Sequence, residues 1–394
     1  MSKAVISFFP VGRGDMTLLC LADGDETSLV IDVNIRGVAD DPNDPTRDVA
    51  KDLRSRLKRD AKGRPYVDGF LLSHPDQDHC AGARSHFYLG PPDQYPDDAK
   101  KDEEKKIFIR QLWSSPLAFR RASKDHVLCD DAKAFNTEAK RRVKVNREKR
   151  FVGVGEGDRI LIMGEDENGK TDDLQPILVR AGESFQGVNN QARDFLKTTL
   201  LAPRLQENAE DEELLSKNHS SVIANLKIAA NANQQDGCRF LTGGDAEVAI
   251  WERLWRRYRN NVEPLKYDLL LTPHHCSWHT LSYDSWSKLR EEAQVAPDAR
   301  SALSQTRPGA SIVSSSQPII DDDNDPPCIR AEREYKAIVD AAGGSFYCTG
   351  EHPNTSAPEP LEFEVTAYGP AKLLGASATS VIATSRPPRA GRRA

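Results

Sequence analysis

Four side chains that could bind a metal ion lie within six consecutive residues of this 394-residue chain. They are His74, Asp76, Asp78 and His79. The apolar residues 70–72 before them are typical of a short buried strand, and Pro75 prevents a helix from continuing through the cluster. Imidazole and carboxylate donors together suit Zn, Mn or Fe better than a metal that prefers soft thiolates. The alternative interpretation is a polar turn that happens to contain two histidines and two aspartates.

Two later segments repeat this order of an apolar strand followed by potential ligands. Residues 238–242 are followed by two glycines and Asp245, and residues 267–271 are followed by Thr-Pro, His274 and His275. Glycines allow a backbone to pass close to a neighbour, so Asp245 could point into the same space as other ligands. Asp245 could also be the N-cap of the helix that follows it. One such strand end can arise by chance, but three in one chain indicate a metal site.

These side chains must be positioned by a scaffold of strands and helices. Residues 4–9 and 28–34 are predicted as strands, and residues 44–63 as a helix that buries Val49 and Leu53. Strands that alternate with helices, with an irregular ligand loop between them, are typical of a layered α/β fold.

The first cluster resembles the His-x-His-x-Asp-His signature of the metallo-β-lactamase fold, with Asp76 at the position of the second histidine. This variant, followed by a small residue and Gly82, is similar to the soluble hydrolase domain of the competence protein ComEC. Further matching segments are the Val-Gly-x-Gly-Asp turn ending at Asp15, the strand ending at Asp32, the turn from Asn218 to Ser221, the Gly-Asp step at Asp245, and the Pro-His-His segment ending at Ser277. The resemblance covers residues 4–90 and 218–350, and Cys276 departs from the glycine that the family has there.

The resemblance implies an α/β (α+β) protein with a metallo-β-lactamase-type αββα sandwich and two divalent metal ions, Zn or Mn, between the sheets at one edge. The implied ligands are His74 and Asp76 for one metal, Asp78, His79 and His274 for the other, and Asp245 between the two. His275 remains an alternative to His274, and His219 is a candidate third histidine for the first metal. The residues implied to support these ligands are Asp15, Asp32, Asn218, Ser221 and Ser277.

The chemistry of such a centre is hydrolysis. Two metals about 3.5–4 Å apart lower the pKa of a bridging water, and the resulting hydroxide attacks the substrate in line. The metals also stabilise the negative charge that builds on the substrate oxygen. The implied catalytic residues are Asp78, His79 and Asp245, and Asp78 is the alternative general base if only one metal binds.

The segment 91–217 lies largely outside the resemblance and is predicted as a basic helical insertion. Its cationic side chains are Arg120, Arg121, Lys140, Arg141, Arg142, Lys144 and Arg147. They could form a wall that contacts nucleic-acid phosphates beside the metal loop. The alternative is a solvated helix end, where the helix dipole favours cations.

Composition narrows the class of protein further. A net charge of −6 argues against a protein that coats nucleic acid without specificity, although it allows a local basic groove. No apolar run approaches about 18 residues, so no membrane partner is expected. Seven cysteines without regular spacing indicate reduced thiols and a cytoplasmic protein. We expect one domain over residues 1–375 and a disordered basic tail over residues 376–394.

The resemblance implies a metal-dependent phosphodiesterase that cuts DNA, for instance a free-standing nuclease in phage defence, with a regulatory protein partner left open. A hydrolase of small esters, lactones or lactams would use the same metals in a narrow apolar pocket rather than an open basic groove. A third hypothesis is a regulatory module with a degenerate metal site. It is motivated by Cys276 and by the loop 322–327, which lacks the histidine that the family has.

Overall fold

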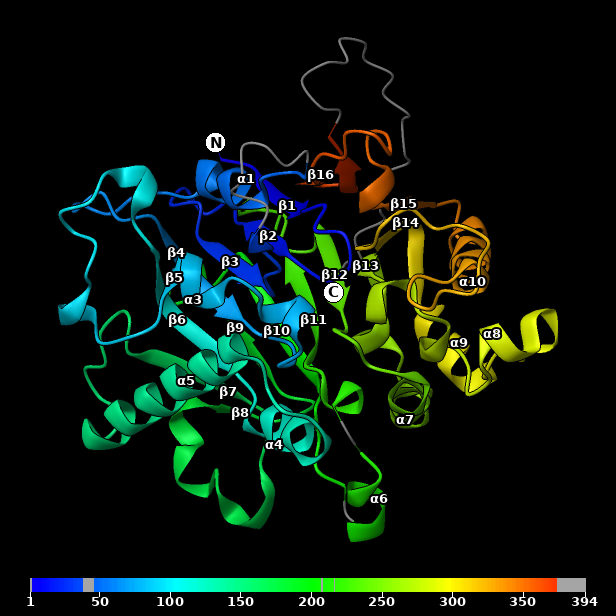
Figure 1. The fold of residues 1–394 in the computed structure, drawn as a ribbon, viewed down its shortest axis with the longest axis horizontal. Helices are drawn as coiled ribbons and strands as arrows, with labels where there is room; N and C mark the ends of the chain where they lie inside the picture. The colour runs from blue at the N-terminus through cyan, green and yellow to red at the C-terminus, as the bar shows by residue number, and fades with distance from the viewer. Residues whose placement is uncertain (1, 38–45, 207, 216, 374–394) are drawn as a thin grey trace.

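The computed structural model describes residues 2–37, 46–206, 208–215 and 217–373, which form two β-sheets with helices on their outer faces (Figure 1). The strands of the first sheet lie in the order β17 (Gly369–Lys372), β16 (Leu361–Thr366), β1 (Ala4–Phe8), β2 (Thr17–Cys20), β3 (Ser28–Ile31), β4 (Tyr66–Leu71), β6 (Ile107–Ser114), β7 (Arg159–Met163) and β8 (Leu178–Val179), with β5 (Phe87–Tyr88) paired to β6. The strands of the second sheet lie in the order β15 (Ser345–Cys348), β14 (Thr306–Ser314), β13 (Tyr267–Leu271), β12 (Cys238–Thr242), β11 (Ile223–Ile228), β10 (Leu196–Ala202) and β9 (Ser184–Gln186).

Three hydrophobic clusters show how the layers pack. Residues of both sheets, such as Phe8 and Phe240, are buried together and form the core between the sheets. A second cluster, which includes Leu53 and Phe135, joins the outer face of the first sheet to its helices, and a third, around Trp251, does the same for the second sheet. The helices are α1 (Val49–Arg56), α4 (Pro116–Asp125) and α5 (Asp130–Glu148) on the first sheet, and α7 (Val248–Tyr258), α9 (Pro297–Leu303) and α10 (Ile329–Asp340) on the second. The predicted αββα sandwich is confirmed.

Both sheets contain a block of parallel strands. The pairs β3–β4, β4–β6, β12–β13 and β13–β14 are all parallel. The register places Ile31 beside Leu71 in the first sheet and Leu241 beside Leu270 in the second. Because the carboxyl ends of neighbouring parallel strands meet at one edge, the segments after β3 and β4 lie together, as do those after β12 and β13. These four segments carry all of the predicted metal ligands except His219.

The segment 91–217 is part of the sandwich rather than a separate helical insertion. It contains the expected basic helices α4 and α5, but also β6, β7 and β8 of the first sheet and β9 and β10 of the second. Trp113 of β6 is buried in the core between the sheets. Hydrophobic periodicity does not show clearly that this segment supplies strands to both sheets, because β8 and β9 are only two and three residues long and β9 is largely exposed.

Helix α1 is shorter than the helix predicted over residues 44–63. It follows the N-cap Asp48 and ends at Arg56, and both Val49 and Leu53 are buried as their spacing predicts. The remaining short helices are α2 (Gln77–Cys80), α3 (Ala83–His86), α6 (Ala209–Glu213) and α8 (Trp286–Leu289).

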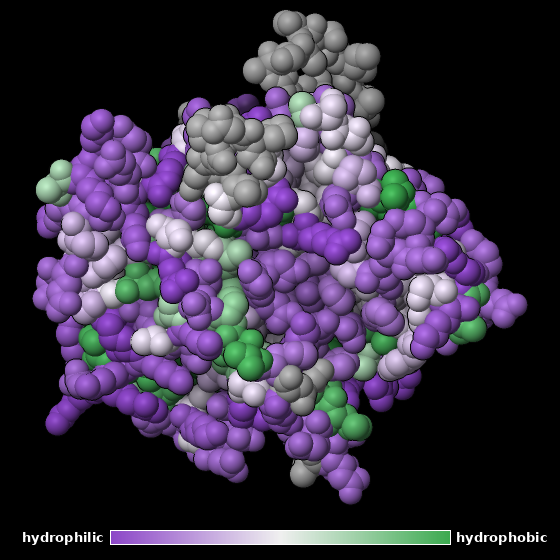
Figure 2. Space-filling model, viewed as in Figure 1, coloured by the Kyte–Doolittle hydropathy of each residue, from purple (hydrophilic) through white to green (hydrophobic). Residues whose placement is uncertain are grey.

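The surface seen in Figure 2 is mainly hydrophilic, with hydrophobic residues in small separate groups. None of the helices in the described ranges has the length and apolar character that crossing a membrane requires. The basic tail expected over residues 376–394 lies outside the described residues.

Candidate metal centre

The loop after β4 folds against the end of β3. Asp32, directly after β3, has a positive φ of 54° and accepts two hydrogen bonds from Ser73, from its N–H at 2.6 Å and from its Oγ at 2.6 Å. The same carboxylate lies 2.8 Å from Nδ1 of His79. The following short helix α2 leaves Asp78 partly exposed and buries His79. Asp32 thus fixes both the start of the ligand loop and one of its histidines.

Asp245 reaches the same place from the second sheet. Gly244 before it has a φ of 47°, and a side chain there would lie 2.8 Å from Oγ of Ser73, so the close approach requires glycine. The N–H of Asp245 donates to Oγ of Ser221 at 3.0 Å, which orients the buried carboxylate. The N-cap of α7 is Glu247, and Asp245 instead faces the histidines.

The two carboxylate oxygens of Asp245 face different histidines. Oδ1 lies 2.9 Å from Nε2 of His79 and 3.4 Å from Nε2 of His275. Oδ2 lies 3.3 Å from Nε2 of His74 and 3.7 Å from Nε2 of His274. This geometry suits a carboxylate that is shared by two metal positions.

The potential ligand atoms form three groups, and within each group they lie within 4.8 Å of one another. The groups are Asp78, His79, Asp245 and His275; His74, Asp76 and Asp245; and Asp15, Asp32 and His79. The first two groups share Asp245 and resemble the two halves of the expected centre. The third group lies on the Nδ1 side of the His79 ring, opposite the Nε2 atom that faces Asp245.

His275, the alternative to the favoured His274, is the histidine that stands with Asp78 and His79. The reason is the backbone after β13, where both histidines have a φ of 51° and Cys276 has a φ of 68°. This sharp turn carries His275 toward the loop of β4 and leaves His274 on the Oδ2 side of Asp245. Cys276 is buried in the core outside the second sheet and belongs to none of the three groups.

Carboxylates behind the rings orient two of the histidines. Nδ1 of His79 lies 2.8 Å from Asp32, and Nδ1 of His275 lies 3.2 Å from Asp15. A histidine held in this way through Nδ1 presents its Nε2 lone pair to a metal. The two Nε2 atoms lie 3.1 Å apart, and Nε2 of His74 is buried with no hydrogen-bond partner among the described residues. The donor set therefore fits divalent metal ions, which would accept these lone pairs.

The cluster gathers opposite charges in a small buried volume. Burial of the Asp78 carboxylate would raise its pKa, but a hydrogen bond from His275 and the charge of His79 lower that pKa below its usual range. Burial would likewise raise the pKa of Asp245, but the charges of the surrounding histidines lower it. In turn, burial would lower the pKa of His275, but Asp245 and Asp15 raise it to about 10, so a metal that binds at Nε2 must displace a proton there. Both Asp78 and Asp245 are thus ionised near neutral pH, the form in which carboxylates bind metals.

The ligands open into a cavity of about 430 Å³. Three residues that line it were not predicted from the sequence: Arg13, Cys129 and Lys217. Nζ of Lys217 donates to Oδ2 of Asp76 at 2.6 Å, so this lysine balances the charge of that carboxylate. Sγ of Cys129, at the N-cap of α5, lies 3.5 Å from Sγ of Cys80. A lone cation or thiol has no sequence signature, although Lys217 directly precedes the recognised turn at Asn218.

The other predicted supporting residues contact the ligands less directly. Nδ2 of Asn218 donates to Oε1 of Glu247 at 2.8 Å, and that oxygen lies 3.9 Å from Nδ1 of His274. His219 is in none of the three ligand groups, and its Nε2 lies 3.6 Å from Oε2 of Glu247. Oγ of the buried Ser277 accepts a backbone N–H at 3.1 Å within its own turn. Asn218, through Glu247, and Ser221, through the N–H of Asp245, therefore connect the recognised turn to the centre.

Arginines predicted to contact nucleic acid are paired inside the protein. Glu212 accepts hydrogen bonds from both Arg120 and Arg121, at 2.7 and 2.6 Å. Glu138 accepts a hydrogen bond of 2.6 Å from Nε of Arg142. Arg121 and Arg142 are only 1% exposed, so neither can reach the phosphate of a substrate in this structure. They lie on the inner faces of α4 and α5, where a buried carboxylate offsets the cost of burying the guanidinium.

The remaining members of this basic group lie farther out. Arg141 is bound to Asp158 at 2.7 Å, and Arg147 to Asp173 at 2.6 Å. Lys140 and Lys144 are exposed. The basic run of α5 is therefore largely neutralised by carboxylates from later in the chain.

No family model and no curated protein matches this sequence. A solved structure described as Igni18, a novel metallo hydrolase from the hyperthermophilic archaeon Ignicoccus hospitalis, is similar, with 14% sequence identity and a TM-score of 0.37. The match covers 92% of this chain and 99% of that chain. A likeness of this size carries no inference, so the functional assignment rests on the residues of the site.

Proposed function

We propose that this protein is a metal-dependent hydrolase that cuts phosphodiester bonds in DNA. The observation that carries this proposal is the position of Asp245, whose two oxygens join two groups of metal-ligating side chains beneath a polar cavity. Divalent ions held there supply Lewis acidity and lower the pKa of a water that they bind.

The residues of the chain divide the remaining tasks. Asp15 and Asp32 hold the rings of His275 and His79 so that both Nε2 atoms face Asp245. Oδ2 of Asp78 lies 3.5 Å from Nε2 of His275, and the side chain is 39% exposed at the cavity. If only one metal binds, Asp78, as an ionised carboxylate in contact with solvent, is placed to accept a proton from an attacking water; with two metals it would be a ligand.

The shape of the surroundings supports an extended anionic substrate. The cavity at the ligands shares Arg13, Gln77 and Asp78 with a second cavity of about 820 Å³. Together they make an open, polar channel on the described surface, whereas a small ester or lactam is best held by a mainly apolar pocket. Arg13 lines both cavities of the channel, and we assign it to the substrate phosphates in place of the paired arginines of α5, whereas Lys217 is itself paired with Asp76.

The test combines metal content with cleavage. Purified protein is loaded with Mn, Zn or Mg, its bound metal is measured by mass spectrometry, and linear, circular and single-stranded DNA and RNA are offered as substrates. We expect up to two metals per chain and metal-dependent cutting of DNA. Asp245→Asn should lose bound metal and reduce the cleavage rate by at least about 1,000-fold, because both metal positions share this carboxylate.

The matched control is Asp173→Asn, at an exposed aspartate that pairs with Arg147 on α5. Its metal content and cleavage rate should equal those of the wild type. Cutting that persists in Asp245→Asn would contradict the proposed site. Full metal occupancy without cleavage of any nucleic acid, but with hydrolysis of a small ester or lactam, would contradict the proposed substrate.

A further inference from the structure

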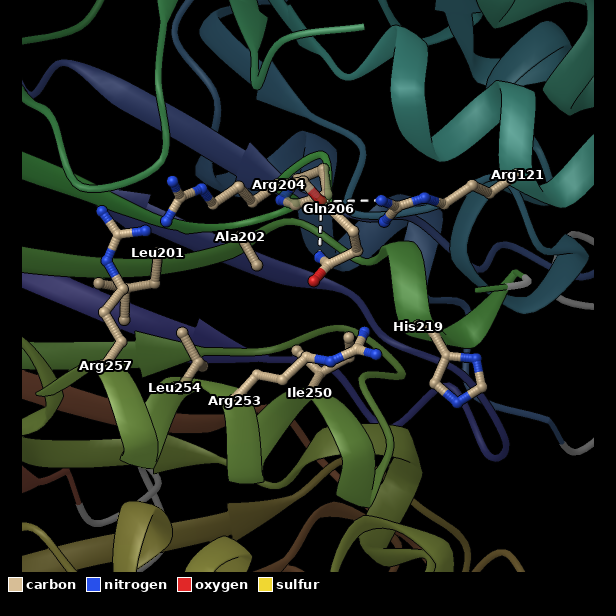
Figure 3. A pocket seen from close by; sticks show the side chains of 11 residues that line it. Arg121, Leu201, Ala202, Arg204, Gln206, His219, Ile250, Arg253, Leu254 and Arg257 are labelled. Carbon is tan, nitrogen blue, oxygen red and sulfur yellow. Dashed lines mark hydrogen bonds between the residues drawn. The ribbon is translucent and has the colours of Figure 1, made fainter. Parts of the chain in front are cut away.

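A third cavity lies beside the metal centre, between α7 and the chain that follows β10. Its volume is about 210 Å³. In Figure 3, Arg204 and Gln206 enter it from one side, and Arg253 and Arg257 of α7 enter from the other. The polar residues of the lining are Arg121, Arg204, Gln206, His219, Arg253 and Arg257. The lining thus includes four arginines and no carboxylate.

Two of these arginines lack the carboxylate pairing that neutralises Arg121. Arg121 is held by Glu212, with hydrogen bonds of 2.6 and 2.9 Å. Neither Arg253 nor Arg257 has a carboxylate oxygen within 4.0 Å among the residues that the structure describes. Nη1 of Arg253 is buried without a hydrogen-bond partner in that same set, and Arg257 reaches only the carbonyl of Ala181, at 3.3 Å.

An uncompensated arginine in such a place has an energetic cost. Burial lowers the pKa of Arg253 below its ordinary value; Asp211 opposes this shift, and Arg256 and Arg121 add to it. The position follows Ile250 by three residues and precedes Leu254, so it faces the same way as the apolar side chains that cover the sheet. A buried donor with no acceptor is expensive, and a bound anion would remove that cost.

The residue type and the volume define the ligand. A guanidinium presents its N–H groups in a planar fork that matches two oxygens of a phosphate or similar oxyanion. Two unpaired guanidiniums favour a dianion over a monoanion. Because a water molecule takes about 30 Å³, and pockets for larger organic ligands exceed about 300 Å³, the cavity suits an anion of a few heavy atoms.

We propose that this cavity binds a phosphate-class anion, either free phosphate or diphosphate or the phosphate group of a larger ligand, through Arg253 and Arg257. The site is distinct from the metal ligands but adjoins them. His219, which lines the cavity, lies 3.6 Å from Glu247, and Glu247 lies 3.9 Å from His274. The proposal does not depend on the nature of the substrate that the metal centre cuts.

The experiment measures anion binding by calorimetry on the full chain, before and after treatment with a chelator. The probes are inorganic phosphate, pyrophosphate and adenosine 5′-monophosphate. We expect saturable binding that survives the chelator, with pyrophosphate bound more tightly than phosphate. Binding of the nucleotide as strong as that of phosphate would show that the anion can belong to a larger ligand; binding of the inorganic anions alone would show a site for free anions.

The variants separate this cavity from other cationic surface. Arg253→Gln and Arg257→Gln should each weaken pyrophosphate binding by about tenfold or more, the effect of losing one charge-assisted contact. Arg256→Gln, on the exposed side of the same helix, should bind as the wild type does. The exposed Arg257 carries the test if the Arg253 variant does not fold. The proposal is overturned if no probe binds, if binding disappears with the chelator, or if both pocket variants bind as tightly as Arg256→Gln.

Discussion

Helices α5 and α7 both carry several arginines, but the surroundings of those side chains differ. On α5, Arg142 is fully buried and still bound to Glu138 at 2.6 Å, while Arg141 reaches Asp158 at 2.7 Å. On α7, Nη1 of Arg253 is buried next to other arginines and has no acceptor among the described residues. The arginines of α5 stabilise the fold through these ion pairs, whereas Arg253 of α7 keeps a charge that only a bound ligand would neutralise.

This difference shows that a run of basic residues in the sequence does not predict where the folded protein presents a basic surface. The run of lysines and arginines from residue 140 to residue 150 suggested a wall for nucleic acid, yet carboxylates from later segments pair with Arg141 and Arg147. The arginine cavity has no such run, because its members come from α4, from the chain after β10 and from α7. Charge that is available to a ligand depends on unpaired side chains, not on their number.

The largest expected effect comes from breaking the buried pair of α5. Glu138→Ala leaves Arg142 buried without its carboxylate, and we expect the free energy of unfolding to fall by about 3–5 kcal/mol. Chemical denaturation measures this change. The control is Glu148→Ala, whose partner Lys144 is exposed at 3.8 Å, and which should cost less than about 0.5 kcal/mol. Equal losses in both variants would show that the α5 arginines are not held as described.

An intermediate effect is expected at Glu212, which binds two arginines of α4. Burial opposes the shift, but hydrogen bonds from Arg121 and Arg120 lower the pKa of Glu212 from 4.5 to about 2. A carboxylate with a lowered folded-state pKa stabilises the protein above its unfolded pKa, and this contribution is lost as the pH falls through its folded pKa. Glu212→Gln should therefore cost about 1–2 kcal/mol at pH 7, and progressively less between pH 4.5 and pH 2.

Unfolding curves of wild type and variant across this pH range provide the measurement. The neighbouring Glu213→Gln, at a side chain that is 80% exposed, is the matched control and should show no such pH dependence. A constant difference between wild type and Glu212→Gln at all pH values would argue against an ionised Glu212 as the partner of these arginines.

The smallest effect on stability distinguishes the two helices most clearly. In phosphate-free buffer, Arg253→Gln should change the free energy of unfolding by less than about 0.5 kcal/mol, or raise it, because the wild-type cation has no partner to lose. Arg142→Gln, by contrast, should destabilise the protein by several times as much. Thermal unfolding with and without pyrophosphate completes the comparison, since the anion should stabilise the wild type and not Arg253→Gln.

Local patterns in the sequence were sufficient to predict the strands that carry the site. The apolar runs before His74, before Asp245 and before His274 are strands β4, β12 and β13, because parallel strands covered on both faces consist of nearly continuous apolar residues. The predicted turn at Asp15 and strand end at Asp32 also meet the ligands. In segment 91–217, strand β10 escaped prediction although it has seven residues and is mostly buried, because its Lys-Thr-Thr stretch interrupts the apolar pattern.

The choice between His274 and His275 could not be made from the sequence. Both residues follow the same strand, and the side to which each ring points depends on three successive positive φ angles. Nothing in the residue types requires that conformation, since β-turns with positive φ usually rely on glycine or asparagine. The partner of Arg121 was equally hidden, because Glu212 lies about ninety residues from α4 along the chain.

What the sequence alone determined is therefore the chemistry available at three strand ends: imidazole and carboxylate donors in the order that a metal centre needs. The tertiary structure decided which donors share a metal position, and it decided which arginines stay unpaired beside them. The physical reason is the range of the interactions. Strand formation and ligand type follow from neighbouring residues, whereas the distance between Asp245 and His79, or between Arg121 and Glu212, depends on how the sheets and helices pack.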